Sequence, residues 1–189
     1  MTGAAKQKAL DRIAAEIVRC KTCKRGKIGR PVPGEGNPNA NIVFIGEAPG
    51  KTEAQTGRPF VGRAGKILRD LIQAAGLDAE KVYITSPVKY LPKYVTPTPA
   101  DIAHGRKHLE AQLKIIAPKI VVLLGNVASK ALLPERTISI GSAHGTIVKA
   151  GKRDYFISYH PAAPLHSPKL RPVLKQDFKK LKKYLNAPK

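Results

Sequence analysis

The segment NIVFIGEAPGKTEAQTGRPFVGRAGKIL, residues 41–68, joins an apolar run to a helical pattern through a loop rich in glycine and proline. Its beginning, NIVFIG (41–46), is an apolar run between turn-forming residues, which predicts a buried strand. In AGKILRDLIQAAG (64–76), apolar residues recur at helical spacing and a glycine ends the pattern, which predicts a helix. A strand and a helix joined in this way are typical of α/β domains.

The same alternation continues through most of the chain. Buried strands are predicted at 81–86 and 119–125, and strand-like patterns occur at 137–140, 145–150 and 153–159. Helices are predicted at 5–19, 98–116, 126–133 and 173–185. We therefore expect residues 1–189 to form one layered α/β domain around a mainly parallel sheet.

The charge of the chain favours a polyanionic partner. Lys and Arg number 34 against 13 acidic residues, which gives a formal net charge of +21 and a pI near 10.2. Such a domain attracts nucleic acid, although a merely solvated basic surface is the simpler alternative. The chain has no Trp, which argues against an open platform that stacks many bases of a single strand.

Membrane and secretory segments are not expected. The chain contains no run of about 18 apolar residues, and its first residues lack the apolar centre of a signal peptide. We therefore expect a cytoplasmic protein with no membrane partner, associated with the nucleoid, or nuclear in a eukaryote.

Three unusual loops follow predicted strands: GEAPG (46–50), SPVKY (86–90) and HPAAPLHSP (160–168). Ligands of such sheets bind beyond the carboxyl ends of the strands, so these loops are the candidate site. Neither GxGxxG nor GxxxxGK[ST] is present, which argues against a phosphate-binding loop and against a nucleotide-using metabolic enzyme.

Three side chains in this region suit chemistry on a nucleobase. Glu47 at a strand end suits a water-orienting or general-base role, or else it caps the next helix. Phe60 stands among proline and glycine and suits stacking on a base, or else it is a core residue. His160 suits hydrogen bonding to charge on a leaving group, or else it is structural.

Taken together, the motifs resemble the uracil-DNA glycosylase superfamily, and most of all its iron–sulfur family 4. GEAPG with GRPFVGRAGKIL (57–68) looks like the first family motif, and HPAAPL (160–165) looks like the second. VYITSPVK, PKIVVLLG and the N-terminal CKTC stand at matching places, and the resemblance extends over about residues 8–185. It implies a four-stranded parallel sheet between helices, and thus an α/β/α fold.

The resemblance also implies an activity and residue roles. A monomeric, monofunctional enzyme would flip deoxyuridine out of single- or double-stranded DNA and hydrolyse its N-glycosidic bond. Glu47 would position the attacking water, and His160 would stabilise the uracil anion. Uracil would meet Gly46, Ala48, Phe60 and Ser86. The DNA strand would meet Pro161, Ala162, Leu165, His166 and Lys169, with Leu165 as the wedge.

One departure from the family concerns the reading of the base. Family 4 usually has asparagine where this chain has Ser86, and the amide reads the Watson–Crick edge of uracil. A hydroxyl holds orientation less well, so discrimination would be weaker or would act through water. This keeps a second hypothesis open: a DNA-binding sensor of uracil or deaminated bases with little or no catalysis.

The second departure concerns the family's [4Fe–4S] cluster, which four cysteines bind. Cys20 and Cys23 match the first pair, but the other two positions fall near Tyr90 and Gly105. We expect no cofactor, with Tyr90 and its neighbours filling the gap. Three alternatives remain: zinc bound by the cysteines together with His104 and His108, a residual iron–sulfur cluster at the cysteines, or a redox disulfide between them.

Overall fold

A central sheet organises the protein in the computed structural model, which describes residues 1–94 and 96–187. The sheet has six strands in the order β2-β4-β3-β6-β8-β7. The middle four strands are parallel to one another: β4 (Val82–Thr85), β3 (Ile42–Ile45), β6 (Ile120–Leu124) and β8 (Arg153–Ser158). The two edge strands are antiparallel to their neighbours: β2 (Glu35–Gly36) and β7 (Thr146–Ala150).

The expectation of a four-stranded sheet is therefore wrong in its strand count, although four parallel strands do form the centre. β8 runs back along β7 after a tight turn at Gly151, and β2 is too short to carry a periodic signal. The strand expected at 137–140 is also wrong, because Ile140 begins helix α7 (Ile140–Ala143). Ile138 and Ile140 pack against the core from a loop and a helix instead.

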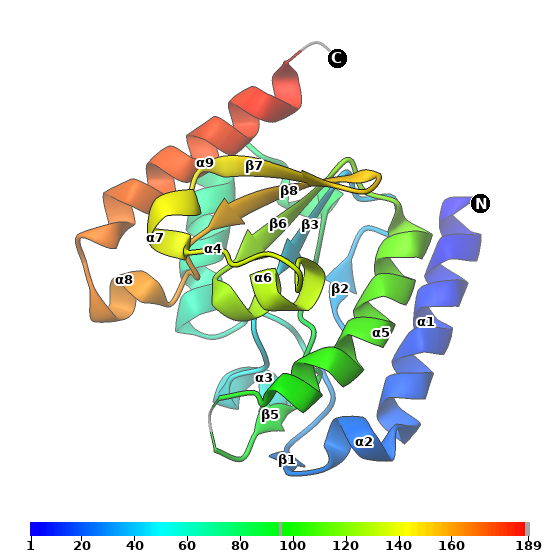
Figure 1. The fold of residues 1–189 in the computed structure, drawn as a ribbon. Coiled ribbons are helices and arrows are strands. Elements are labelled where there is room, and N and C mark those ends of the chain that lie inside the picture. Colours follow the sequence, from blue (N-terminus) through cyan, green and yellow to red (C-terminus); the bar gives the residue numbers. More distant parts are fainter. Residues whose placement is uncertain (95, 188–189) are drawn as a thin grey trace.

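Helices cover both faces of the sheet and give three layers (Figure 1). Successive residues of β3 point to opposite faces: Val43 joins one apolar cluster, and Phe44 joins the other. The first cluster is closed by α1 (Gly3–Arg19), α5 (Pro99–Ile116) and α6 (Asn126–Leu132). The second is closed by α4 (Arg63–Ala74) and α9 (Leu170–Asn186). There Phe44 stacks on Phe178, with ring centroids 5.8 Å apart.

Shorter elements surround these layers. They are α2 (Lys21–Lys24), α3 (Lys51–Thr56), α8 (Ala163–His166), the 3-10 turn η1 (Ala79–Lys81), and the small antiparallel pair β1 (Lys27–Ile28) and β5 (Leu91–Pro92). Thr98 is the N-cap of α5, because its Oγ1 accepts a hydrogen bond from Asp101 N at 3.2 Å, and Asp101 Oδ2 accepts one from Thr98 N at 3.0 Å.

The carboxyl ends of the parallel strands lie level with one another. Ile45 pairs with Thr85 on one side and with Leu123 on the other, so the loops that follow these strands leave the sheet at one edge. This edge faces downward in Figure 1. Within the described part of the chain, no helix has both the length and the apolar character needed to cross a membrane.

Candidate active site

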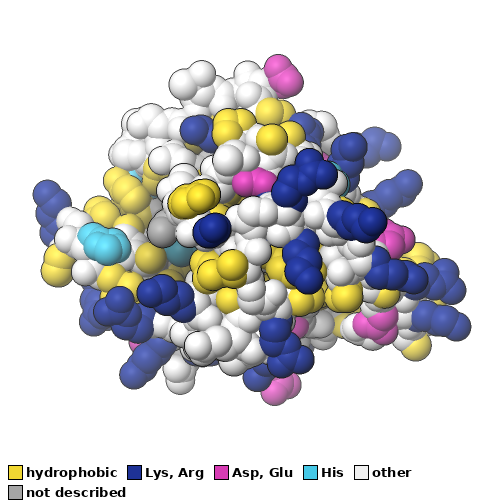
Figure 2. Space-filling view, turned by 90° about the horizontal axis from the view of Figure 1, so that it is seen from below, with side chains coloured by type: hydrophobic (Ala, Val, Ile, Leu, Met, Phe, Trp, Pro, Cys, Tyr) yellow, Lys and Arg dark blue, Asp and Glu magenta, His cyan; other side chains and the backbone are white. Residues whose placement is uncertain are grey.

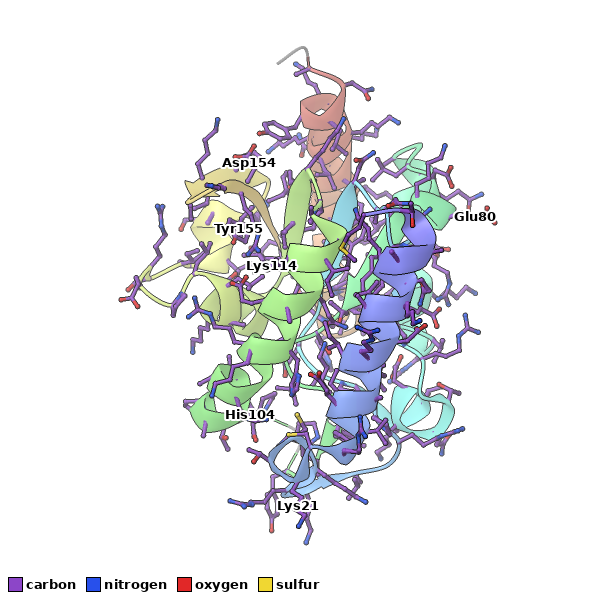
Figure 3. All side chains as sticks on the ribbon, turned by 90° about the vertical axis from the view of Figure 1, so that its right-hand side faces the viewer. Lys21, Glu80, His104, Lys114, Asp154 and Tyr155 are labelled. Atoms are coloured by element: carbon purple, nitrogen blue, oxygen red, sulfur yellow. The ribbon has the colours of Figure 1, made fainter. Side chains whose placement is uncertain are left out.

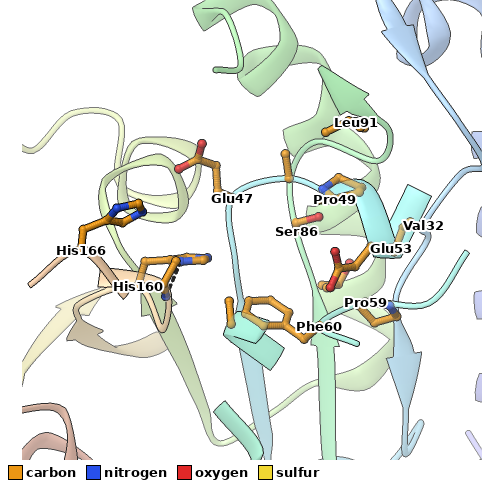
Figure 4. A pocket seen from close by; sticks show the side chains of 15 residues that line it. Val32, Glu47, Pro49, Glu53, Pro59, Phe60, Ser86, Leu91, His160 and His166 are labelled. Carbon is orange, nitrogen blue, oxygen red and sulfur yellow. Dashed lines mark hydrogen bonds between the residues drawn. The ribbon is translucent and has the colours of Figure 1, made fainter. Parts of the chain in front are cut away.

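A cavity of about 430 Å³ lies at the carboxyl ends of the strands. This volume is within the range of small-molecule sites, about 300–1,000 Å³. The loops after β3, β4 and β8 all contribute to its wall, as does the segment that ends at Phe60. In Figure 4 the ring of Phe60 lies between His160 on one side and Ser86 with Glu53 on the other.

The structure brings most of the predicted site residues together. The cavity is lined by Glu47, Ala48, Phe60, Ser86, His160, Ala162 and His166. Gly46 adjoins it, since a Cβ there would stand 2.6 Å from the Phe60 ring and 3.9 Å from His160 Nε2. Three residues predicted to touch DNA are not part of the lining: Pro161, Leu165 and Lys169. Pro161 is buried, whereas Leu165 is 38% exposed on α8 and Lys169 is exposed.

Glu47 presents a half-buried carboxylate at the end of β3. Burial raises the pKa of this carboxyl above its ordinary value. The side chain follows Gly46, whose backbone N–H donates to the carbonyl of Thr85 at 2.9 Å and so anchors the loop on β4. A carboxylate with a raised pKa is a stronger base than one in water.

His160 is held as a neutral imidazole with a known tautomer. The backbone N–H of Ala162 donates to His160 Nδ1 at 3.1 Å, so the ring proton belongs on Nε2. Burial lowers the pKa of His160 to about 4, which keeps the ring uncharged at neutral pH. Gly125, at φ 89°, makes room for this residue, because a Cβ there would stand 3.2 Å from His160 Cβ. Nε2–H is thus free to donate toward the cavity.

Phe60 is fixed by an unusual backbone conformation. Its φ is 51°, in the left-handed region that residues with side chains seldom adopt, at a cost of about 1–2 kcal/mol. The Phe60 carbonyl accepts a hydrogen bond from Arg69 Nη1 at 2.7 Å. It also approaches Gly65 so closely that a Cβ there would lie 1.6 Å from the oxygen. This close approach turns the ring toward His160, with centroids 5.7 Å apart.

The hydroxyl of Ser86 already donates a hydrogen bond within the protein. Its Oγ donates to the carbonyl of Val88 at 2.8 Å, and the residue is 7% exposed. The lone pairs of Oγ remain as acceptors at the cavity wall. In this arrangement Ser86 can receive a hydrogen bond from a bound base but does not donate one.

Several residues of the wall were missed in the sequence. Glu53 lies on α3, and its Oε1 accepts a hydrogen bond from Gly62 N at 2.8 Å, where α4 begins. The segment expected to be a loop contains α3, which at six residues is too short to show an apolar stripe. The one feature of the sequence that indicates this helix is Gly57, which ends α3 in the left-handed conformation. The other wall residues that were not predicted are mostly apolar or small: Val32, Pro49, Gly50, Pro59, Ala64, Thr85 and Leu91.

The residues near the cysteines do not fit a four-cysteine cluster. Tyr90 is 2% exposed and packs with Cys23, Ile13 and Ile17. At Gly105 a Cβ would lie 2.0 Å from the carbonyl oxygen of Pro87, so that position has no space for a cysteine. The two cysteines are free thiols in the structure. No catalytic step is therefore assigned to an iron–sulfur cluster.

Cys20 and Cys23 do have potential metal-binding partners. One ligand atom from each of Cys20, Cys23, His104 and His108 lies within 4.8 Å of all the others. Burial is the main cause that raises the pKa of the Cys23 thiol to about 12, and burial lowers the pKa of both imidazoles. Lys89, which is fully buried nearby, donates to Thr85 Oγ1 at 2.7 Å and to Gln112 Oε1 at 2.8 Å.

Basic side chains cover the face around the strand ends. Figure 2 shows Lys and Arg spread across this face. Exposed basic residues adjoin the segments that form the cavity: Lys51, Arg58, Arg63 and Lys169. A polyanion is therefore attracted to the face on which the cavity lies.

The fold and site define a class: a three-layer α/β domain with a base-sized cavity at the ends of parallel strands, set in a basic face. Comparison with known proteins gives the family. A family model described as "Uracil DNA glycosylase superfamily" matches residues 33–186. The chain belongs to this superfamily.

Three relatives lie within it. The type-4 uracil-DNA glycosylase of Sulfurisphaera tokodaii is 38% identical, over 96% of this chain and 87% of that protein. The type-4 enzyme of Saccharolobus solfataricus is 40% identical over 94% and 87%. That of Archaeoglobus fulgidus is 40% identical over 92% of each chain. The similarity thus extends over nearly the whole of this chain.

Proposed function

We propose that the protein is a DNA repair glycosylase that flips deoxyuridine out of DNA, hydrolyses the N-glycosidic bond and leaves an abasic site for base excision repair. One observation carries the proposal: a single cavity gathers the Glu47 carboxylate, the Phe60 ring and the Nε2–H of His160. Similarity to type-4 uracil-DNA glycosylases over nearly the full chain supports it.

The base is held between rigid surfaces. Phe60 stacks on uracil, and its strained backbone keeps the ring in place before the base arrives. Backbone groups at Gly46 and Ala48 meet the edges of the base, and Ser86 Oγ accepts a hydrogen bond from uracil N3–H. Extrusion of the nucleotide costs a few kcal/mol, which these contacts offset.

Hydrolysis divides between two side chains. Glu47 orients a water toward C1′ of the sugar and stabilises the positive charge that develops there. The C1′–N1 bond breaks, its electron pair leaves with uracil, and the water oxygen bonds to C1′ while the Glu47 carboxylate accepts the proton that the water loses. His160 donates from Nε2–H to O2 of the uracil anion. A neutral imidazole can give this hydrogen bond without transferring its proton.

The loop after β8 would hold the DNA. Leu165 is exposed on α8 beside the cavity, and we assign it as the wedge that enters the minor groove. Pro161, Ala162, His166 and Lys169 would contact the strand around it. We propose that the protein acts as a monomer on single- or double-stranded DNA, in the cytoplasm at the nucleoid or in a eukaryotic nucleus.

A second candidate function is a sensor of uracil or deaminated bases with weak catalysis. The commitment of the Ser86 hydroxyl to the Val88 carbonyl favours it, because Ser86 then has no proton to donate to uracil O4. The presence of both Glu47 and His160 in the wall of one cavity favours the enzyme instead.

An abasic-site assay separates the two. Purified protein is incubated with a labelled duplex or single strand that contains one uracil, and alkali then cleaves any abasic product. We expect cleavage by the wild type and a loss of about 10²–10⁴-fold for Glu47→Gln. Uracil-dependent binding without alkali-labile product from the wild type would assign the sensor function and exclude the enzyme.

A further inference from the structure

A cluster of four metal-ligating side chains lies outside the proposed active site. Cys20 ends α1, Cys23 lies in α2, and His104 and His108 lie on α5. In Figure 3 the sulfur atoms of the cysteine pair lie beside the labelled His104, where α1 and α2 approach α5. None of the four residues lines the cavity at the strand ends.

The distances within the cluster suit one small ion. Zinc–ligand bonds of about 2.0–2.3 Å place neighbouring ligand atoms of a tetrahedral site about 3.3–3.8 Å apart. In the structure all four ligand atoms lie within 4.8 Å of one another, and Cys20 Sγ is 3.1 Å from His104 Nε2. Small side-chain movements therefore bring the four atoms to zinc-binding distances.

Local structure orients each pair of ligands. Cys20 is the N-cap of α2, and its Sγ accepts a hydrogen bond from Cys23 N at 3.4 Å, which holds the Cys20 side chain over the turn that carries Cys23. His104 and His108 are one helical turn apart, so they share a face of α5. Their ring centroids are 5.7 Å apart. Two sulfur and two imidazole ligands in tetrahedral reach are the preferred set for Zn²⁺.

We propose that Cys20, Cys23, His104 and His108 bind one structural Zn²⁺ ion. Four protein ligands close the coordination shell, so the ion leaves no position for a substrate and acts as a cross-link. It joins the end of α1 and the short α2 to α5. Tyr90 packs against Cys23, and Leu91, the next residue, belongs to the cavity wall, so the ion supports that wall from behind.

Metal analysis of untagged protein, purified without chelator, tests the proposal directly. We expect about one zinc per chain in the wild type, and a loss of bound zinc in Cys23→Ser and in His108→Ala. Lys107→Ala is the matched control, because Lys107 is exposed on α5 between the two histidines, and it should keep the metal. Iron with visible charge-transfer absorption would overturn the proposal, and so would metal-free wild type, with either free thiols or a disulfide.

A second variant guards against misfolding of the ligand-deletion variants. His108→Cys preserves a four-ligand shell, so it should retain the metal that His108→Ala loses. After exchange with Co²⁺, the wild type should show the ligand-field absorption of a tetrahedral S₂N₂ site, and His108→Cys should show a stronger sulfur charge-transfer band. An identical spectrum in both proteins would show that His108 is not a ligand and would overturn the proposal. These readouts are independent of uracil excision.

Discussion

At the scale of single residues, the site depends on which atoms carry protons. The N–H of Ala162 fixes the proton of His160 on Nε2, and burial holds the pKa of that ring at about 4. Burial moves the Glu47 carboxyl in the opposite direction on the pH scale, above its ordinary pKa. In both cases burial favours the uncharged form of the side chain, and His160 is therefore neutral at neutral pH.

The pH profile of uracil excision should therefore have an acid limb that belongs to Glu47. Activity needs the carboxylate, so kcat/KM should fall as the pH drops through the raised pKa of Glu47 and should level off above that pKa. His160→Leu should lower kcat/KM by about 10²–10³-fold at every pH without moving this limb. A limb near pH 6.5 that disappears in His160→Leu would contradict the neutral imidazole.

Ser86 is the residue at which base selection can be changed. Ser86→Asn supplies an amide donor and an acceptor at the cavity wall, where the serine hydroxyl is committed to Val88. We expect the ratio of kcat/KM for uracil over cytosine to rise by up to about tenfold, since one hydrogen bond contributes about 0.5–1.5 kcal/mol. Ser86→Ala is the control and should not raise the ratio. An unchanged ratio in Ser86→Asn would show that this position does not read the base.

At the scale of elements, the segment between β3 and α4 is a rigid frame. Glu53 on α3 caps the start of α4 through Gly62 N, and the carbonyl of Phe60 lies against Gly65 in the first turn of α4. The two contacts fix the backbone at Phe60 and Gly62, where the loop joins α4, and so hold the Phe60 ring. The position of α4 therefore determines the position of the Phe60 ring.

Gly65→Ala tests this frame because we expect it to change the free energy of unfolding in the direction opposite to the usual one. Glycine to alanine within a helix normally stabilises by about 0.5–1 kcal/mol. Here the new Cβ would meet the Phe60 carbonyl, so we expect destabilisation of about 1–3 kcal/mol in chemical denaturation, together with reduced uracil excision. Lys66→Ala, at an exposed neighbouring position, should change neither property. A stabilised Gly65→Ala variant would refute the close approach.

At the scale of the whole molecule, charge governs the encounter with DNA. The net charge of +21 includes Lys169 at the start of α9, beside the loop assigned to DNA, and Lys183 in the last turn of the same helix. In Figure 1 the two ends of α9 lie far apart, with α8 near the first. A phosphate contact is therefore expected at one end of this helix only.

Salt titration of DNA binding can distinguish the two lysines. Binding of Glu47→Gln to a uracil-containing duplex should weaken steeply as salt rises, because each phosphate contact releases counterions. Adding Lys169→Ala should reduce the slope of log Kd against log salt by about 0.9, whereas adding Lys183→Ala should leave it unchanged. A flat titration of the parent variant would contradict the assignment of DNA as the partner.

Much of this architecture could be predicted from periodicity, and the failures have local causes. β3 and β6 are continuous apolar runs, and α5 begins with a capping box. These patterns identify the three elements from the sequence alone. β2 and α3 are too short to show a periodic pattern of apolar residues, so tertiary contacts determine their structure. The candidate site followed from strand ends, because Glu47, Ser86 and His160 each come directly after or close to a predicted strand. Glu53 could not be found in that way, since it reaches the cavity from a helix.

The narrow gap between Gly105 and Pro87 limits what protein engineering can do with this scaffold. A designer who wished to install a redox-active cluster by exchanging two side chains would find that cysteine at position 105 displaces α5 from the loop beneath it. The backbone, rather than the choice of ligands, would have to be redesigned first.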